Sequence, residues 1–151
     1  MCLCVYFLPE VDDEVLVAFE HGLIDQPYII GSLWNGKDQA PESNQNGKND
    51  HRAFKSRSGH IIRFNDQDGQ ETIEIIDKTG NNKIVIDSSK NTVSIEANSD
   101  IEIKSATGKL TMSAIGIELK SQADVKIEAT SNMDLKANAQ VSVKGTIINL
   151  N

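Results

Sequence analysis

The sequence has few of the residues that build a globular core. Aromatic residues make up 5% of its 151 residues, and apolar residues together make up 38%, below the roughly 45–50% of typical globular domains. The apolar residues that are present are mostly Ile, Val and Leu, spread evenly along the chain. A chain poor in aromatics and rich in evenly spaced β-branched residues favours a thin, repetitive β-core.

Clusters of positive charge and long apolar runs are also lacking. The net charge is −7, and no stretch gathers Lys and Arg as phosphate-backbone binding requires, so nucleic acid is not an expected partner. No run approaches the ~18 apolar residues of a transmembrane helix. The start MCLCVYFLPEVDDE lacks a positive region and a long apolar stretch, so we expect no signal peptide.

Cysteine and histidine are scarce. Cys2 and Cys4 occupy alternate positions with no nearby His, which favours two small residues on a strand over a zinc site. His21, His51 and His60 have no Ser or Cys partner in a nucleophile pattern, so each is interpreted as a surface or turn residue. We therefore expect no catalytic residue, no metal ligand and no cofactor, and the protein is not expected to be an enzyme.

Two other features suggest a ligand site. The run Asn65–Gln70 contains Asp66, Asp68 and Gly69. This pattern resembles the start of a calcium loop but lacks its closing Glu, so a hairpin turn is the preferred interpretation.

Trp34 is the single tryptophan. Packing of the N-terminal region against the base of the rest is favoured over a role as a ligand platform.

Three regions follow one another along the chain. Residues 1–36 alternate with period two over residues 6–8, 15–19 and 27–34, as in the C-terminal part of a small antiparallel barrel that three strands cannot close. Residues 37–60 are polar and contain several breakers, which predicts a linker or neck. Residues 61–86 alternate apolar runs with Gly and Asn turns, which predicts hairpins.

Towards the C-terminus an apolar–x–apolar triplet recurs. The first members of successive triplets lie 9, 8, 9, 7, 8, 8, 8 and 7 residues apart, and such regularity over nine units is the strongest pattern in the sequence. Eight of the triplets supply the predicted core of a shaft: Ile84, Ile86, Val93, Ile95, Ile101, Ile103, Leu110, Met112, Ile117, Leu119, Val125, Ile127, Met133, Leu135, Val141 and Val143. The ninth is Ile148 and Leu150 at the chain end.

The repeat implies stacking. One triplet buries two apolar side chains, which cannot offset the entropy of ordering about eight residues. Two geometries fit the period: one chain coiling with three octads per turn, or three chains winding together as a three-sided prism. The period does not separate them. The narrow faces and the lack of an amphipathic capping helix favour three chains, which leave no strand edge along the shaft.

Long contiguous stretches resemble a known family. YFLPEVDDEVLVAFEHG (residues 6–22), PYIIGSLWNG (27–36) and KSRSGH (55–60) are similar to the OB-fold region of the VgrG and phage-baseplate spike family and the segment that follows it. The resemblance implies an all-β fold, with a partial OB-fold at 1–36, a neck at 37–60 and an intertwined homotrimeric β-helix, a triangular β-prism of octad repeats, at 61–151.

The resemblance also implies a function. Members of this family are homotrimeric, membrane-puncturing spikes of contractile injection machines such as type VI secretion systems and phage-tail-like particles. We expect assembly in the cytoplasm, delivery to the outside or into a target cell by contraction, hub and tube proteins at the N-terminal end, and transient contact with the target membrane. A PAAR-repeat-like tip protein is expected on the cap-binding residues Ile147, Ile148, Asn149, Leu150 and Asn151.

This sequence departs from the family pattern in three respects. From these 151 residues we expect none of three family features: the first OB-fold strands with the hub domains before Met1, a His-x-His iron site at the ending, and an effector domain. The alternatives are a trimeric or monomeric β-solenoid acting as an adhesin or carbohydrate-binding stalk, and a β-helical polysaccharide lyase. The absence of Trp, Tyr and Phe from residues 84–151 argues against stacking on sugars.

Overall fold

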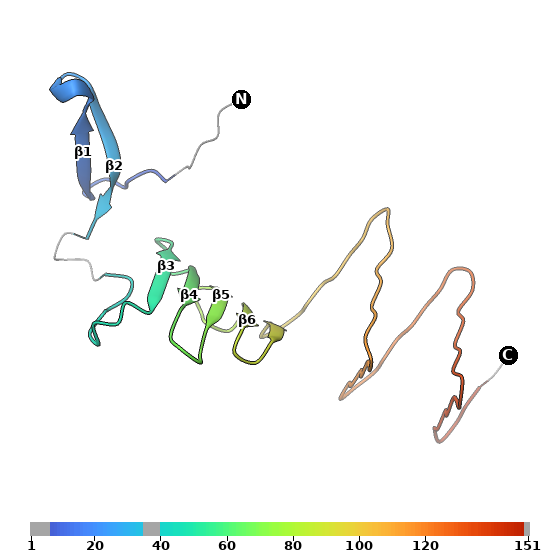
Figure 1. The fold of residues 1–151 in the computed structure, drawn as a ribbon. Helices are drawn as coiled ribbons and strands as arrows, with labels where there is room; N and C mark the ends of the chain where they lie inside the picture. The colour runs from blue at the N-terminus through green and yellow to red at the C-terminus, as the bar shows by residue number, and fades with distance from the viewer. Residues whose placement is uncertain (1–6, 35–39, 150–151) are drawn as a thin grey trace. The chain divides into compact units, whose positions relative to one another are not determined.

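The computed structural model describes residues 7–34 and 40–149, and the regular structure in them is β-structure. Seven strands form two antiparallel sheets, one of two strands and one of five (Figure 1). The described residues contain one short 3-10 turn, η1 (Glu20–Gly22), and no α-helix. The predicted all-β class is therefore confirmed.

The smaller sheet pairs β1 (Glu14–Phe19) with β2 (Pro27–Leu33). The register shifts between Leu16 and Val17, so the pair contains a β-bulge, a feature that increases local twist. η1 and the residues after it connect the strands, and the Tyr28 hydroxyl donates a 2.9 Å hydrogen bond to Glu20 Oε2 across this connection. Two of the three predicted strands are present; the third was predicted around Tyr6, which lies outside the described residues, and Leu8, which is not in a strand.

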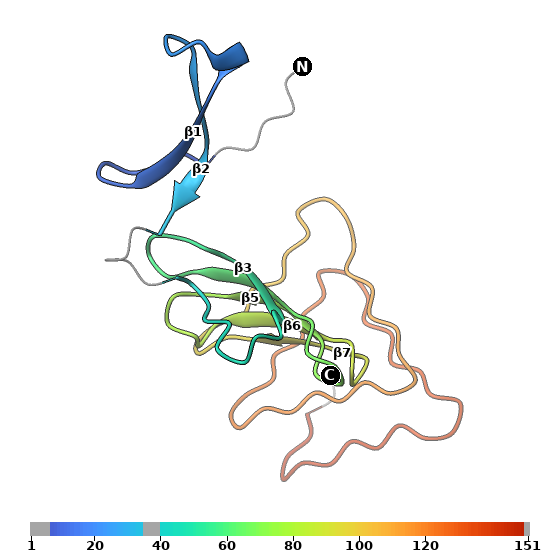
Figure 2. The ribbon, with the colours of Figure 1, turned by 60° about the vertical axis from the view of Figure 1, so that its left-hand side comes forward.

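The larger sheet is an antiparallel meander in the order β3-β4-β5-β6-β7 (Figures 1 and 2). Its strands are β3 (His51–Lys55), β4 (Ile61–Asn65), β5 (Thr72–Ile76), β6 (Lys83–Asp87) and β7 (Thr92–Glu96). The hairpins predicted over residues 61–86 are therefore confirmed. β3 was not predicted, because its sequence HRAFK lies in the polar segment interpreted as a linker.

The hairpin turns use backbone conformations that most residues avoid. Gly69, Gly80 and Asn91 have φ values of 73°, 76° and 55°, in the left-handed region that Gly, and less readily Asn, adopts without strain. Each reverses the chain between neighbouring strands. The turn interpretation of Asn65–Gln70 is confirmed, since the Gln70 N–H donates to the Gln67 carbonyl at 2.8 Å within it.

Residues 104–149 form a separate unit and contain no strand. Figure 1 draws this segment in orange and red without arrows. The described part of the single chain therefore contains no β-helix or solenoid, and residues 61–96 form hairpins rather than successive layers of a coil. An intertwined β-helix is a relationship between chains, which a single chain does not display.

Candidate assembly face

One face of the five-stranded sheet is almost entirely apolar. The strand register places side chains from all five strands in two parallel rows. The first row is Phe54, Ile62, Ile75, Ile84 and Ile95, and the second is Arg52, Phe64, Ile73, Ile86 and Val93. We call these ten residues the apolar face. Two residues per strand make a stripe that is narrow and continuous, because alternate side chains of a strand point to the same side.

Among the described residues up to Ile103, no second layer of strands or helices covers the apolar face. Ile75, in the central strand, is 50% exposed and Ile95 is 59% exposed, and none of the described residues is buried. A contiguous row of exposed Ile, Val and Phe side chains of this kind marks an interaction site.

The triplets beyond the sheet are exposed in the same way. Every predicted core residue from Ile101 to Val143 that the structure describes is more than a third exposed, as are Ile147 and Ile148 near the chain end. Of the predicted tip residues, Leu150 and Asn151 lie outside the described residues. The structure therefore brings Ile84, Ile86, Val93 and Ile95 together on the apolar face and leaves the later triplets exposed.

The N-terminal segment borders one end of the apolar face. Phe7 stacks on Phe54 with ring centroids 6.1 Å apart and planes inclined by 11°. Arg57 Nη1 lies 3.1 Å from both carboxylate oxygens of Glu10. A groove of about 1390 Å³ lies between this segment and the sheet, and Ile75 is among its apolar lining residues. The groove is the part of the apolar face that the chain itself partly encloses.

The opposite face of the sheet carries paired charges. Arg63 Nε and Nη2 contact Glu74 Oε2 at 2.8 and 2.5 Å, and Arg63 Nη1 contacts Glu42 Oε1 at 3.2 Å. His51 Nδ1 lies 3.3 Å from Glu42 Oε2. Burial raises the pKa of Glu42, but hydrogen bonds and charges from Arg63 and His51 outweigh it and lower that pKa overall. We call Glu42, His51, Arg63 and Glu74 the charged cluster.

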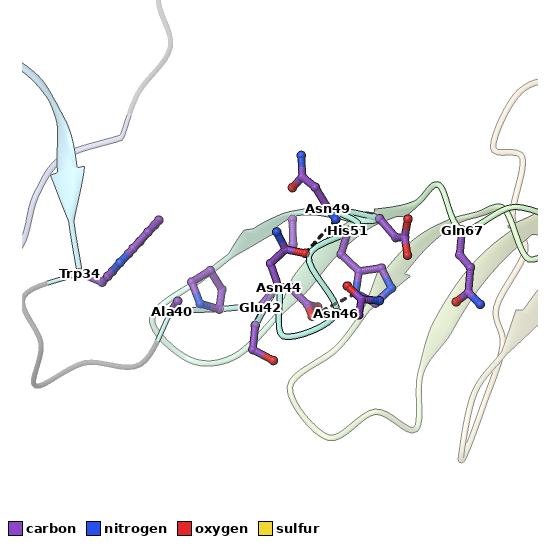
Figure 3. Close-up of a pocket in the computed structure, with 12 residues that line it drawn as sticks. Trp34, Ala40, Glu42, Asn44, Asn46, Asn49, His51 and Gln67 are labelled. Atoms are coloured by element: carbon purple, nitrogen blue, oxygen red, sulfur yellow. Dashed lines mark hydrogen bonds and ion pairs between the residues drawn. The ribbon is translucent and has the colours of Figure 1, made fainter.

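A polar hollow of about 480 Å³ lies beside the charged cluster (Figure 3). The residues that line the hollow come largely from the loop before β3. Asparagine side chains of this loop accept hydrogen bonds from backbone N–H groups of the same loop. The Asn49 N–H donates to Asn44 Oδ1 at 2.8 Å, and the Lys48 N–H donates to Asn46 Oδ1 at 3.0 Å. Trp34, for which packing against the base of the rest was predicted, also lines this hollow beside the loop before β3, and it is 67% exposed.

The three histidines occupy different settings. His21 lies in η1 with a φ of 46°. His51 belongs to the charged cluster, and His60 Nδ1 accepts a 3.2 Å hydrogen bond from the Lys78 N–H. In each case the histidine belongs to a turn or a strand, and the printed contacts of His51 and His60 join elements rather than pair with a nucleophile.

Two hairpin turns are organised by aspartates. Asp77 accepts hydrogen bonds from Thr79 Oγ1 and from the backbone and side chain of Asn82. Burial raises the pKa of Asp77, but these hydrogen bonds lower it to about 2. The pKa of Asp87 is also lowered to about 2, chiefly by the side chain of Lys90, 2.6 Å away, and by Ser89. Each carboxylate therefore closes its turn in the charged form.

Neither a metal site nor a membrane-spanning helix is found within the described ranges. In residues 7–34 and 40–149, no three His, Cys, Asp or Glu side chains are grouped to hold a metal ion. Nor does this part of the chain contain a helix with the length and apolarity to cross a bilayer. Cys2 and Cys4 lie outside it.

The fold thus defines an all-β chain whose main surface feature is an uncovered apolar face. Residues 4–34 match the family model of the type VI secretion system and phage-baseplate injector OB domain. No curated protein matches the chain. The match covers the β1–β2 sheet and links the chain, at the level of the family, to components of contractile injection systems.

Proposed function

We propose that this chain is one protomer of a homotrimeric, membrane-puncturing spike of a contractile injection machine, such as a type VI secretion system or a phage-tail-like particle. The observation that carries the proposal is the apolar face. Each strand contributes two side chains to it, and the same spacing of two apolar residues continues in the triplets of residues 101–150. Three copies around a common axis would bury two residues per strand on each side of a prism. The injector OB-domain match at residues 4–34 supplies the functional context.

The chemistry of a three-sided prism explains why the single chain is so exposed. Strands that leave their backbone groups unpaired are unstable alone, and residues 104–149 contain no strand pairing within the chain. Neighbouring copies would provide the missing backbone hydrogen bonds along the whole segment. A shaft closed in this way has no free strand edge and transmits force as a stiff rod.

The proposal assigns the ends of the shaft. Residues 1–36 would be the C-terminal part of an OB-fold next to hub and tube proteins, 37–60 the neck, and 61–151 the spike. Residues 147–151 would bind a PAAR-repeat-like tip protein, and the assembled particle would be made in the cytoplasm and delivered outwards or into a target cell by contraction. The work is mechanical, so the proposal includes no catalytic residue and no cofactor.

Light scattering on the purified full chain tests the proposal. A homotrimer has three times the protomer mass of 16.5 kDa, and this mass is expected to persist on dilution. A chain that remains monomeric at all concentrations contradicts it. The tip assignment has a separate test: Ile148→Asp is expected to abolish co-purification of a PAAR-repeat protein, whereas Ser142→Asp, on the shaft, is expected to retain it.

A further inference from the structure

Charges alternate in sign along the outer positions of three successive octads. In the octads that begin at Ile117, Val125 and Met133, the residue inside the triplet and the residue after it are both charged. The inner positions are Glu118, Lys126 and Asp134, and the following positions are Lys120, Glu128 and Lys136. Both columns alternate, in opposite phase, and the octads are uniformly eight residues apart.

In two of the three octads the structure places the two charges on the same side of the chain. Lys120 Nζ lies 2.9 Å from Glu118 Oε1, and Lys126 Nζ lies 2.8 Å from Glu128 Oε1. All four side chains are more than 70% exposed, so each pair alone contributes little to stability. Their exposure leaves the charged groups available to a strand stacked above or below.

The five-stranded sheet already uses directly opposed charges of opposite sign. Arg63 faces Glu74 across β4 and β5, and Lys83 faces Glu96 across β6 and β7 with a 3.2 Å contact. No register pair in the two described sheets opposes two like charges. Cross-strand pairs of opposite charge stabilise a sheet and like pairs destabilise it, so charge and register agree wherever this chain forms strands.

We propose that the six charged residues form a register ladder between copies of this chain, in which each octad stacks on the next octad of a neighbouring copy. The inference rests on the proposed trimer and specifies its register. When three copies wind around one axis and each moves to the next face after every octad, consecutive octads from neighbouring copies become adjacent strands. Glu118 then faces Lys126, and Lys120 faces Glu128.

Other registers oppose like charges. Stacking on the second octad along would place Glu118 against Asp134 and Lys120 against Lys136. A single chain coiling with three octads per turn would stack each octad on the third one along, which places Lys120 against Lys144 but pairs Lys126 with Glu102 and Glu128 with Lys104. Consecutive stacking makes all four contacts within the six-residue ladder attractive, and its one like pair, Lys136 against Lys144, lies at the edge of the ladder. Consecutive stacking is therefore the register in which all six residues have only attractive contacts with one another, which favours interleaved copies over a self-coiled chain.

Exchanging the charges of the middle octad tests the ladder. The double variant Lys126→Glu/Glu128→Lys of the full chain keeps the composition, the net charge and the pair within the octad, but opposes like charges above and below. We expect the melting temperature of the trimer to fall by about 5–10 °C at low salt. The decrease in melting temperature should be smaller in high salt, because exposed charges are screened.

Reversing the other two octads as well should restore the ladder. The rescue variant adds four substitutions to the double variant: Glu118→Lys, Lys120→Glu, Asp134→Lys and Lys136→Glu. We expect its melting temperature to return to within about 2 °C of the original value, because every ladder contact is attractive again.

A second compensating variant distinguishes the alternatives. Adding Glu102→Lys and Lys104→Glu to the middle-octad exchange repairs a self-coiled chain, in which residues 102 and 104 stack on 126 and 128, and does not repair the interleaved register. Rescue by this variant in place of the six-residue reversal overturns the ladder. If the native chain is a trimer but the middle-octad exchange does not change its melting temperature, the ladder is overturned and the proposed spike is not. A monomeric native chain removes both.

Discussion

The five-stranded sheet and residues 104–149 share one sequence pattern but differ in structure. Both carry apolar–x–apolar triplets, yet the sheet folds by hairpins and the later segment forms no strand. The difference lies in the connections. Gly69, Gly80 and Asn91 reverse the chain with positive φ, and no described residue beyond Asn91 has a positive φ. Without reversals a strand cannot pair with its sequence neighbour in a hairpin, and under the proposed function the later triplets pair with strands from another copy.

The largest expected effect comes from placing a charge on the apolar face. Ile95→Asp should abolish trimer formation, because a carboxylate buried between copies without a partner costs several kcal/mol per copy. Ser94→Asp is the matched control, since Ser94 is the next residue on β7 and points to the opposite face. Light scattering measures both. If Ile95→Asp still forms a full-strength trimer, the apolar face is not the interface.

Hydrogen exchange compares the two regions directly. In the assembled protein, amides of the triplets in 104–149 should be protected to a degree similar to those of β4–β6. On dilution below the assembly concentration, the later segment should lose its protection first, because its hydrogen-bond partners belong to other copies. Mass spectrometry across a dilution series gives the result. Equal loss in both regions would show that the sheet also depends wholly on assembly.

The charged cluster should stabilise the sheet by a smaller amount. Arg63→Met removes the arginine partner of both Glu42 and Glu74, whose side chains are only partly exposed, and is expected to cost about 1–2 kcal/mol per copy, within the lower part of the range for leaving polar groups unpaired. Arg57→Met is the control, since Arg57 pairs with Glu10 at a highly exposed site and should cost below about 1 kcal/mol. Urea unfolding measures the two. Equal costs would contradict a stabilising role specific to the cluster.

The smallest expected effect is a loss of stability at acidic pH that arises in the hairpin turns. The pKa of Asp77 is lowered from 3.8 to about 2, so its contribution to stability is complete above pH ~4 and is lost as the pH falls towards 2. Asp77→Asn should flatten the fall in stability between pH 4 and 2, as followed by circular dichroism. Asp68→Asn is the control in a neighbouring turn, and an identical flattening there would contradict the assignment to Asp77.

Sequence reasoning was most successful where the pattern is local. Alternation and the Gly and Asn turns predicted the β4–β6 hairpins, and the triplets of β6 and β7 share one face as expected. β3 was missed because Ala53 and Phe54 are its only apolar residues. Its strand conformation depends on pairing with β4. The only local indication of β3 was the apolar pair Ala53 and Phe54 between Arg52 and Lys55 in a polar segment.

The charged cluster was also missed. Glu42 lies in a loop far along the chain from Arg63 and Glu74, so no periodicity connects them. Only Arg63 and Glu74 had a local indication, because each occupies the polar middle of an alternating run. The predicted boundaries at residues 36 and 60, the tip residues and the partners remain predictions.

By itself, the sequence determined the β-class, the side of each strand that is apolar and the places where the chain reverses, because side-chain alternation and turn conformations depend on neighbouring residues. The tertiary structure decided that β3 joins the sheet, that Glu42 contacts both Arg63 and His51, and that apolar side chains from all five strands share one face. Those outcomes depend on contacts between residues distant in sequence, and such contacts form only when whole strands are brought into register.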